Sequence, residues 1–146
     1  MNFKKSQSGR SMVEMLGVLA IIGVLSVGGI AGYSLSMRRH RANSIADLVT
    51  KYALISYNNC QKLVLDGRFA QLGACSTDPG FEQSDIGSYP ANVKHIVFTG
   101  IKTDQTTGVD TVEVGVEITD QKLCETVGSI AGTGCNSYVK FKIKQN

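Results

Sequence analysis

Two hydrophobic patterns follow one another in the first half of the chain. The nineteen residues from Met15 to Tyr33 carry no charge, and Ser26 is their only hydroxyl-bearing residue besides the tyrosine. At a helical rise of about 1.5 Å per residue they reach about 28 Å, close to the thickness of one hydrocarbon core. The first pattern therefore predicts a helix that can span a membrane.

After a basic cluster at residues 38–41 the pattern becomes amphipathic. No proline precedes Pro79, so nothing prevents one helix from continuing through the span to about Asp66 and Gly67. Apolar residues recur at helical spacing in this stretch, with a serine and a cysteine on the same face: Ile45, Leu48, Val49, Tyr52, Ser56, Cys60, Leu63 and Val64. A helix with one apolar face should pack against another part of the chain.

The second half of the chain has the alternation of a small sheet. Strands are expected at 91–101, 109–119 and 137–144, the last reading SYVKFKIK. A short helix should begin after Asp120 as N-cap, turn Leu123 and Val127 inward and end among the glycines of 128–134. Residues 72–89 have few periodic apolar positions and are expected to form a surface loop. Together the patterns predict an α+β fold, with a long N-terminal helix packed on a small antiparallel sheet.

Four cysteines, Cys60, Cys75, Cys124 and Cys135, form an even set without the C-x-x-C spacing of a zinc or redox site. Behind an export-type N-terminus, two disulfides in an oxidising compartment are favoured over four reduced, buried thiols. Three pairings are possible and the sequence does not select one. The simplest closes each bond locally, Cys60 with Cys75 and Cys124 with Cys135.

The apolar span itself has three competing interpretations. A secretory signal peptide should have a shorter apolar region, a small-residue cleavage site such as 29–31, and no acid such as Glu14 near its basic residues. A plain membrane anchor fits the length but leaves Glu14 without a role. Basic residues flank both ends of the span, so they do not orient it. The third interpretation begins from the residues around the acid.

Those residues are Gly9, Arg10, Ser11, Met12, Val13 and Glu14, preceded by Lys4 and Lys5. They resemble the signature of type IV pilins and type II secretion pseudopilins, which are prepilins with a class III signal. In that family a short basic leader ends in glycine, a prepilin peptidase cuts after it, and a glutamate is the fifth residue of the mature chain. Here the cut would fall between Gly9 and Arg10, and Glu14 is fifth from Arg10. The resemblance covers about the first quarter of the chain.

Two positions depart from the family pattern. Arg10 stands where the family usually has an apolar residue that is N-methylated after cleavage, which leaves cleavage expected and methylation open. The span also lacks the proline that many pilins carry about two-thirds of the way along, near Ala31. The glycines Gly28, Gly29 and Gly32 can supply a comparable weak point, since glycine costs about 1 kcal/mol relative to alanine inside a helix.

The resemblance implies four regions: a leader peptide (1–9), a transmembrane and assembly helix (10–33), its amphipathic second half (34–67) and a C-terminal globular region (68–146). It implies a filament subunit that is a homo-oligomer, a substrate of prepilin peptidase and a partner of an inner-membrane assembly platform. Glu14 would meet the N-terminal amine of a neighbouring subunit, and the second disulfide would close a C-terminal loop. The protein would lie in the inner membrane before assembly and then in an extracellular pilus or periplasmic pseudopilus.

Alternatives remain open at this point. A minor pseudopilin of a secretion or DNA-uptake system shares every motif, and a membrane-anchored binding domain that never polymerises shares the span. A further alternative is that Glu14 has no role in assembly: its carboxylate would then lie at the level of the lipid headgroups, without a partner.

The sequence contains none of the residue patterns that we would expect of an enzyme. His40 and His95 have no cysteine or acid at metal-ligand spacing, and no nucleophile elbow, Walker sequence or zinc-protease motif occurs. We expect no catalytic residues, no cofactor and no metal. The net charge of +3 is weak support for a nucleic-acid surface, and residues 38–41 fit a solvated collar at the membrane boundary, so DNA is not an expected partner.

Overall fold

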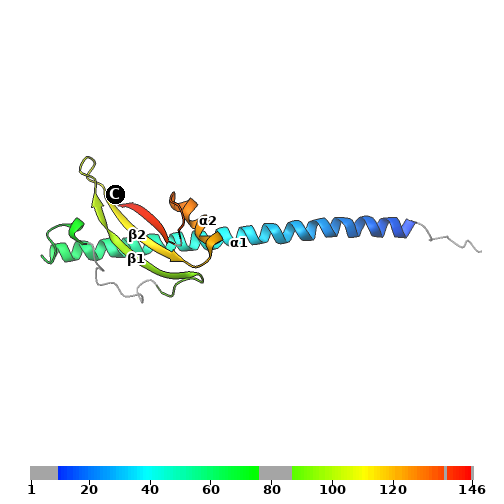
Figure 1. Ribbon diagram of the computed structural model, residues 1–146, viewed down its shortest axis with the longest axis horizontal. Helices are drawn as coiled ribbons and strands as arrows, with labels where there is room; N and C mark the ends of the chain where they lie inside the picture. The colour runs from blue at the N-terminus through cyan, green and yellow to red at the C-terminus, as the bar shows by residue number, and fades with distance from the viewer. Residues whose placement is uncertain (1–9, 76–86, 137, 146) are drawn as a thin grey trace, which may run out of the picture. The chain divides into compact units, whose positions relative to one another are not determined.

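The fold is α+β, as predicted, with a long N-terminal helix packed on a small antiparallel sheet (Figure 1). The computed structural model describes residues 10–75, 87–136 and 138–145, with side chains from Met12 onward. The elements are α1 (Arg10–Leu65), the 3-10 turn η1 (Leu72–Ala74), β1 (Val93–Thr103), β2 (Asp110–Ile118), α2 (Gln121–Ala131) and β3 (Tyr138–Gln145). The chain forms two compact units, Met1–Met37 and Arg38–Asn146, which are described separately.

In the second unit, α1 buries one stripe of side chains in the core. The stripe consists of Ala42, Ile45, Val49, Tyr52, Ala53, Ser56 and Cys60. Five of these were predicted from helical spacing, whereas the two alanines were not, because alanine is equally common on buried and exposed helix faces. Three other predicted positions, Leu48, Leu63 and Val64, are only half-buried.

The helix ends where the sequence indicates. The last turn is closed by Asp66 N donating to the Lys62 carbonyl and by Arg68 N donating to the Leu63 carbonyl. Gly67 between them has φ +74°, the left-handed conformation that glycine adopts at the C-terminal end of helices.

The sheet is a meander in the order β1-β2-β3, with both pairs antiparallel. Alternate residues of the central strand are buried against α1: Val112, Val114, Val116 and Ile118. Val139 and Phe141 of β3 lie on the same face. The strand β1 shifts register between Val93 and His95 and between Phe98 and Gly100. Each shift is a bulge that places two successive residues on the outer face of the sheet.

The helix α2 connects the second and third strands. Its N-cap is Asp120, whose carboxylate accepts a hydrogen bond from Leu123 N at 2.9 Å, as the sequence predicts. Leu123 and Val127 are buried, also as predicted, and Gly132 closes the helix at φ +67°. Gly128 lies inside the helix because a Cβ there would approach the Thr133 carbonyl oxygen to 2.8 Å.

Both disulfides close locally. Cys60 on the α1 stripe is bonded to Cys75 after η1, and Cys124 on α2 is bonded to Cys135 before β3. The bonds span 15 and 11 residues, so each contributes about 3 kcal/mol in the chain-entropy description. Of the predicted surface loop, residues 76–86 lie outside the described residues, and 72–74 form η1.

Candidate assembly site

Glu14 lies in the second turn of α1, four residues after the first helical residue, Arg10. Its side chain is exposed, and it is the only charged residue from Met12 to Met37. Gly9 lies outside the described residues, as does the side chain of Arg10, so of the predicted cleavage pair only the Arg10 backbone is placed. One helical turn therefore separates the acid from the backbone nitrogen that cleavage after Gly9 would release as an amine.

The helix around Glu14 is apolar on every side. Large hydrophobic side chains are exposed in all directions: Met12, Val13, Met15, Leu16, Val18, Leu19, Ile21, Ile22, Val24, Leu25, Val27, Ile30, Tyr33 and Leu35. Met12 is 79% exposed and Ile22 is 53% exposed. A helix that is hydrophobic all round is stable inside a membrane or inside a bundle, and not in water. By length and composition, α1 is the one helix in the described part of the chain that could cross a membrane.

No packing contact within the described chain explains the glycines of this stretch. A Cβ built at Gly17, Gly23, Gly28, Gly29 or Gly32 would meet nothing within 4 Å. Glycine weakens a helix by about 1 kcal/mol relative to alanine, so five glycines represent a cost that no described contact offsets. In lipid, small residues spaced four apart, as Gly28 and Gly32 are, let a second helix approach closely.

Two serine hydroxyls of the stretch are satisfied internally. Ser26 donates to the Ile22 carbonyl at 2.7 Å, and Ser34 donates to the Ala31 carbonyl at 2.9 Å. Each hydroxyl can therefore enter an apolar environment without losing its hydrogen bond. Glu14 is the only charged residue of this stretch, and a charge is expensive in lipid, about 2.5 to 3.5 kcal/mol at the centre of a membrane helix.

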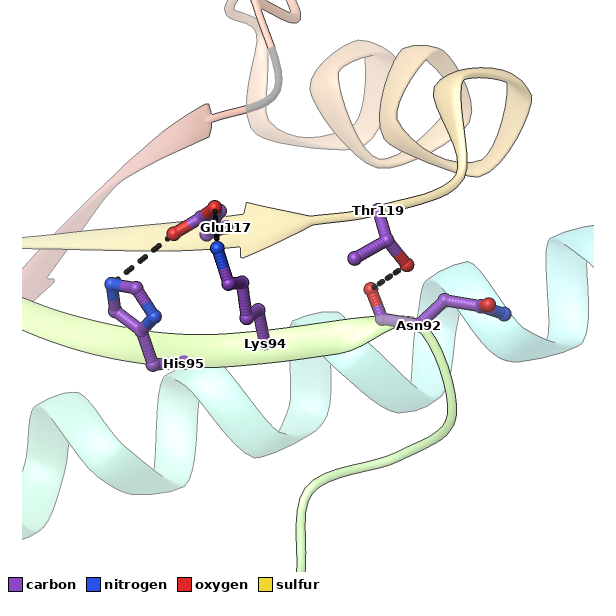
Figure 2. A network of polar contacts seen from close by, with 5 residues as sticks. All are labelled: Asn92, Lys94, His95, Glu117 and Thr119. Atoms are coloured by element: carbon purple, nitrogen blue, oxygen red, sulfur yellow. Dashed lines mark hydrogen bonds and ion pairs between the residues drawn. The ribbon is translucent and has the colours of Figure 1, made fainter.

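The two histidines of the chain, His40 and His95, lie in the second unit. His95 lies on β1, where its Nε2 is 3.3 Å from the Glu117 carboxylate on β2. Lys94 reaches the same carboxylate at 3.0 Å, and Figure 2 shows both side chains converging on it. This cluster was not predicted. The signal for it was two polar residues in succession inside a strand pattern, which the bulge at Val93 and His95 explains.

The same end of the sheet is tied by a turn at Asn92. Thr119 donates to the Asn92 carbonyl through its backbone N at 2.9 Å and through its hydroxyl at 3.3 Å. Figure 2 shows the hydroxyl contact. Asn92 has φ +76°, which asparagine tolerates better than other non-glycine residues. Among all residues the structure describes, no group of three His, Cys, Asp or Glu side chains could hold a metal ion.

Comparisons with protein-family models, with curated proteins and with solved structures found no match to this chain.

Proposed function

We propose that the chain is a structural subunit of a type IV pilus or a pilus-like filament, cleaved by a prepilin peptidase and polymerised through the first part of α1. The observation that carries the proposal is Glu14, a single charge five positions after Gly9 in the sequence, on a part of α1 that is otherwise exposed and apolar. The sequence signature suggests the family. The exposed apolar surface of this part of α1 gives a physical reason for assembly, because such a surface is unfavourable in water.

The apolar helix has two suitable environments. In lipid its exposed side chains are solvated by acyl chains, and in a bundle of like helices they are buried against one another. Moving between the two costs little for the apolar residues, since lipid tails and helix surfaces are similar in polarity. Gly28 and Gly32 leave space on the helix surface for a neighbouring helix, a space that nothing in the described subunit fills.

Glu14 is the residue that distinguishes the two environments. Cleavage after Gly9 would leave a positive α-amine on Arg10 of every subunit, and a staggered neighbour could place that amine beside Glu14. The two charges would then neutralise each other as the helix enters the filament. A buried ion pair contributes little net stability but is a good device for selecting one register.

The test is fibre assembly by Glu14→Ala, with Asp47→Ala as the matched control. Asp47 is an exposed acid on the same helix, in the second unit. Glu14→Ala should remain processed and membrane-bound, while its fibre yield falls at least about tenfold, the effect of losing roughly 1.4 kcal/mol. Asp47→Ala should assemble normally. Normal fibre yield from Glu14→Ala would overturn the proposed role of Glu14.

Intact mass and N-terminal sequencing test the processing step separately. A chain that begins at Arg10 supports the filament proposal, and an added methyl group would report a second modification. A chain that begins at Met1 and stays membrane-bound indicates a binding domain on a plain anchor. Abundance at the cell surface separates a major pilus subunit from a minor subunit of a periplasmic pseudopilus.

A further inference from the structure

The face of the sheet turned away from α1 carries most of the lysines of the second half of the chain. We call it the outer face, and define it by residues that alternate with the buried ones. Among them are Lys94, His95, Val97 and Lys102 of β1, Glu113, Gly115 and Glu117 of β2, and Tyr138, Lys140, Lys142 and Lys144 of β3. Five lysines face two glutamates there, whereas the whole chain is nearly balanced.

Both glutamates are already paired with lysines of β1. Glu117 contacts Lys94 and His95, and Glu113 contacts Lys102 at 3.0 Å. The acids lie lower than the ammonium groups: the side chains of Glu113 and Glu117 are 19% and 29% exposed, against 63% for Lys94 and 74% for Lys102. The outermost layer of this face is therefore cationic.

The three lysines of β3 are exposed and form a row along the edge of the sheet. Residues two apart on a strand are separated by about 6.8 Å, so Lys140, Lys142 and Lys144 span about 14 Å. Within the described residues no ion pair involves their ammonium groups; Lys142 has Glu113 as its cross-strand partner, but that carboxylate contacts Lys102. Three like charges in a row repel one another, and an anionic partner would relieve that repulsion.

An apolar strip runs beside this row. Val97, Gly115 and Lys140 are cross-strand partners in one line across the sheet, and Val97 is exposed. Tyr138 lies across Gly115, where its phenol fills the space that a Cβ would occupy. Burial there, and then the charge of Glu117, raises the pKa of Tyr138, so the phenol is neutral at physiological pH. The ring and Val97 together offer an apolar surface next to the lysine row.

We propose that the outer face binds an acidic polysaccharide, with the lysines of β3 against its carboxylates and with Tyr138 and Val97 against the apolar faces of its sugar rings. The pattern of alternating charge and apolar surface matches a polymer whose rings have C–H faces and whose edges carry carboxylates. Lysine is a point charge without the fork of arginine, and so suits carboxylates at variable positions along a flexible chain. Single-stranded nucleic acids are bound by several successive aromatic rings, and Tyr138 is the only Phe, Tyr or Trp on the described part of this face.

The test is binding of sodium alginate, a polyuronate, to the full chain in neutral detergent micelles, with dextran as the uncharged polymer. The test variant is Lys140→Gln with Lys142→Gln and Lys144→Gln. The matched control is Lys51→Gln with Lys62→Gln and Lys122→Gln, which removes the same charge from exposed lysines of α1 and α2. We expect the test variant to bind alginate at least about fivefold more weakly, with a shallower dependence on salt, and the control to lose less than twofold.

The apolar part of the site is tested by Tyr138→Leu, which keeps an apolar side chain but removes the flat ring. It should weaken alginate binding about threefold without changing the salt dependence, and thermal unfolding verifies that each variant is folded. Three results would overturn the proposal: no alginate binding by the native chain, an equal loss in the control triple variant, or no loss in Tyr138→Leu.

Tighter binding of oligodeoxythymidine than of alginate at equal charge concentration would also overturn it, and would identify a nucleic-acid surface instead. None of these measurements involves Glu14 or fibre assembly, so the failure of this proposal and the failure of the proposed filament function are distinguishable.

Discussion

The two parts of α1 have the same backbone and many of the same residue types, but opposite surroundings. From Met12 to Leu35 the large apolar side chains are exposed, and from Ala42 to Cys60 one stripe is fully buried. Ile22 is 53% exposed, whereas Ile45 is 0% exposed. Hydrophobicity alone therefore does not identify what a helix packs against. The first part has apolar residues on all sides, whereas the second buries most of its apolar residues along one side.

This difference assigns the two parts to different environments. The stripe from Ala42 to Cys60 is complete within the chain, because the sheet and a disulfide cover it. The stretch from Met12 to Leu35 finds no such cover among the described residues of its own unit. Its apolar surface is worth about 25 cal/mol per Å² once removed from water, and in the function we propose that cover comes from lipid or from neighbouring helices.

The largest expected effect compares the two parts directly. Ile45→Ala should lower the free energy of unfolding of the second unit by about 2 to 5 kcal/mol, because it removes buried methylene groups and leaves a cavity. Ile22→Ala, the same change on the exposed part, should leave that free energy within about 0.5 kcal/mol. Denaturant unfolding of the full chain in detergent, followed by near-ultraviolet circular dichroism of the tyrosines, measures both. Equal destabilisation by the two variants would mean that the parts are not energetically separate.

Much of the fold could be predicted from residue patterns, since those patterns report burial. The alternation in 137–144, the Asp120 cap and the break at Gly67 each depend on neighbours in sequence, and each is found in the structure. The bulges of β1 could not be predicted, because they depend on how β2 is registered beside it. The first bulge places both Lys94 and His95 on the outer face of the sheet. Simple alternation would place these two successive residues on opposite faces.

The two candidate sites differ in how far the sequence specifies them. Glu14 is recognised from its offset to Gly9, which is a local feature of the chain. The outer face brings together lysines from strands about 40 residues apart. Its charge is hidden in the total of +3, because the acids that balance it lie elsewhere in the chain or beneath the lysines.

A smaller effect is expected at the contact between the second part of α1 and the sheet. The hydroxyl of Tyr57 donates to the Asp110 carboxylate at 2.7 Å, and Thr103 donates to the other carboxylate oxygen at 2.6 Å. Tyr57→Phe keeps the ring and removes one hydrogen bond to a charged group. It should cost about 1 kcal/mol, below the range for fully buried bonds because the site is half-buried.

The hydrogen bond to Asp110, then burial and the Asp110 charge, raise the pKa of Tyr57 above its usual value. The folded state thus favours the neutral phenol, and the stabilisation is present in full below pH 10 and is lost as the pH rises through the raised pKa. The difference in stability between the native chain and Tyr57→Phe should shrink over that alkaline range. A difference that stays constant up to pH 12 would contradict this assignment.

An effect of the opposite sign is expected within the buried stripe itself. Ser56 is fully buried, and its hydroxyl oxygen has no hydrogen-bond partner among the described residues. A buried polar group without a partner costs about 1 to 3 kcal/mol, so Ser56→Ala should stabilise the second unit. Helix propensity favours alanine as well, by about 0.5 kcal/mol.

Ser44→Ala, on an exposed position of the same helix, carries only the propensity gain. Ser56→Ala should therefore exceed Ser44→Ala by about 1 kcal/mol in denaturant unfolding. A smaller gain at Ser56 than at Ser44 would contradict this prediction. It would mean that the Ser56 hydroxyl contributes favourably to packing in the stripe, although it has no hydrogen-bond partner among the described residues.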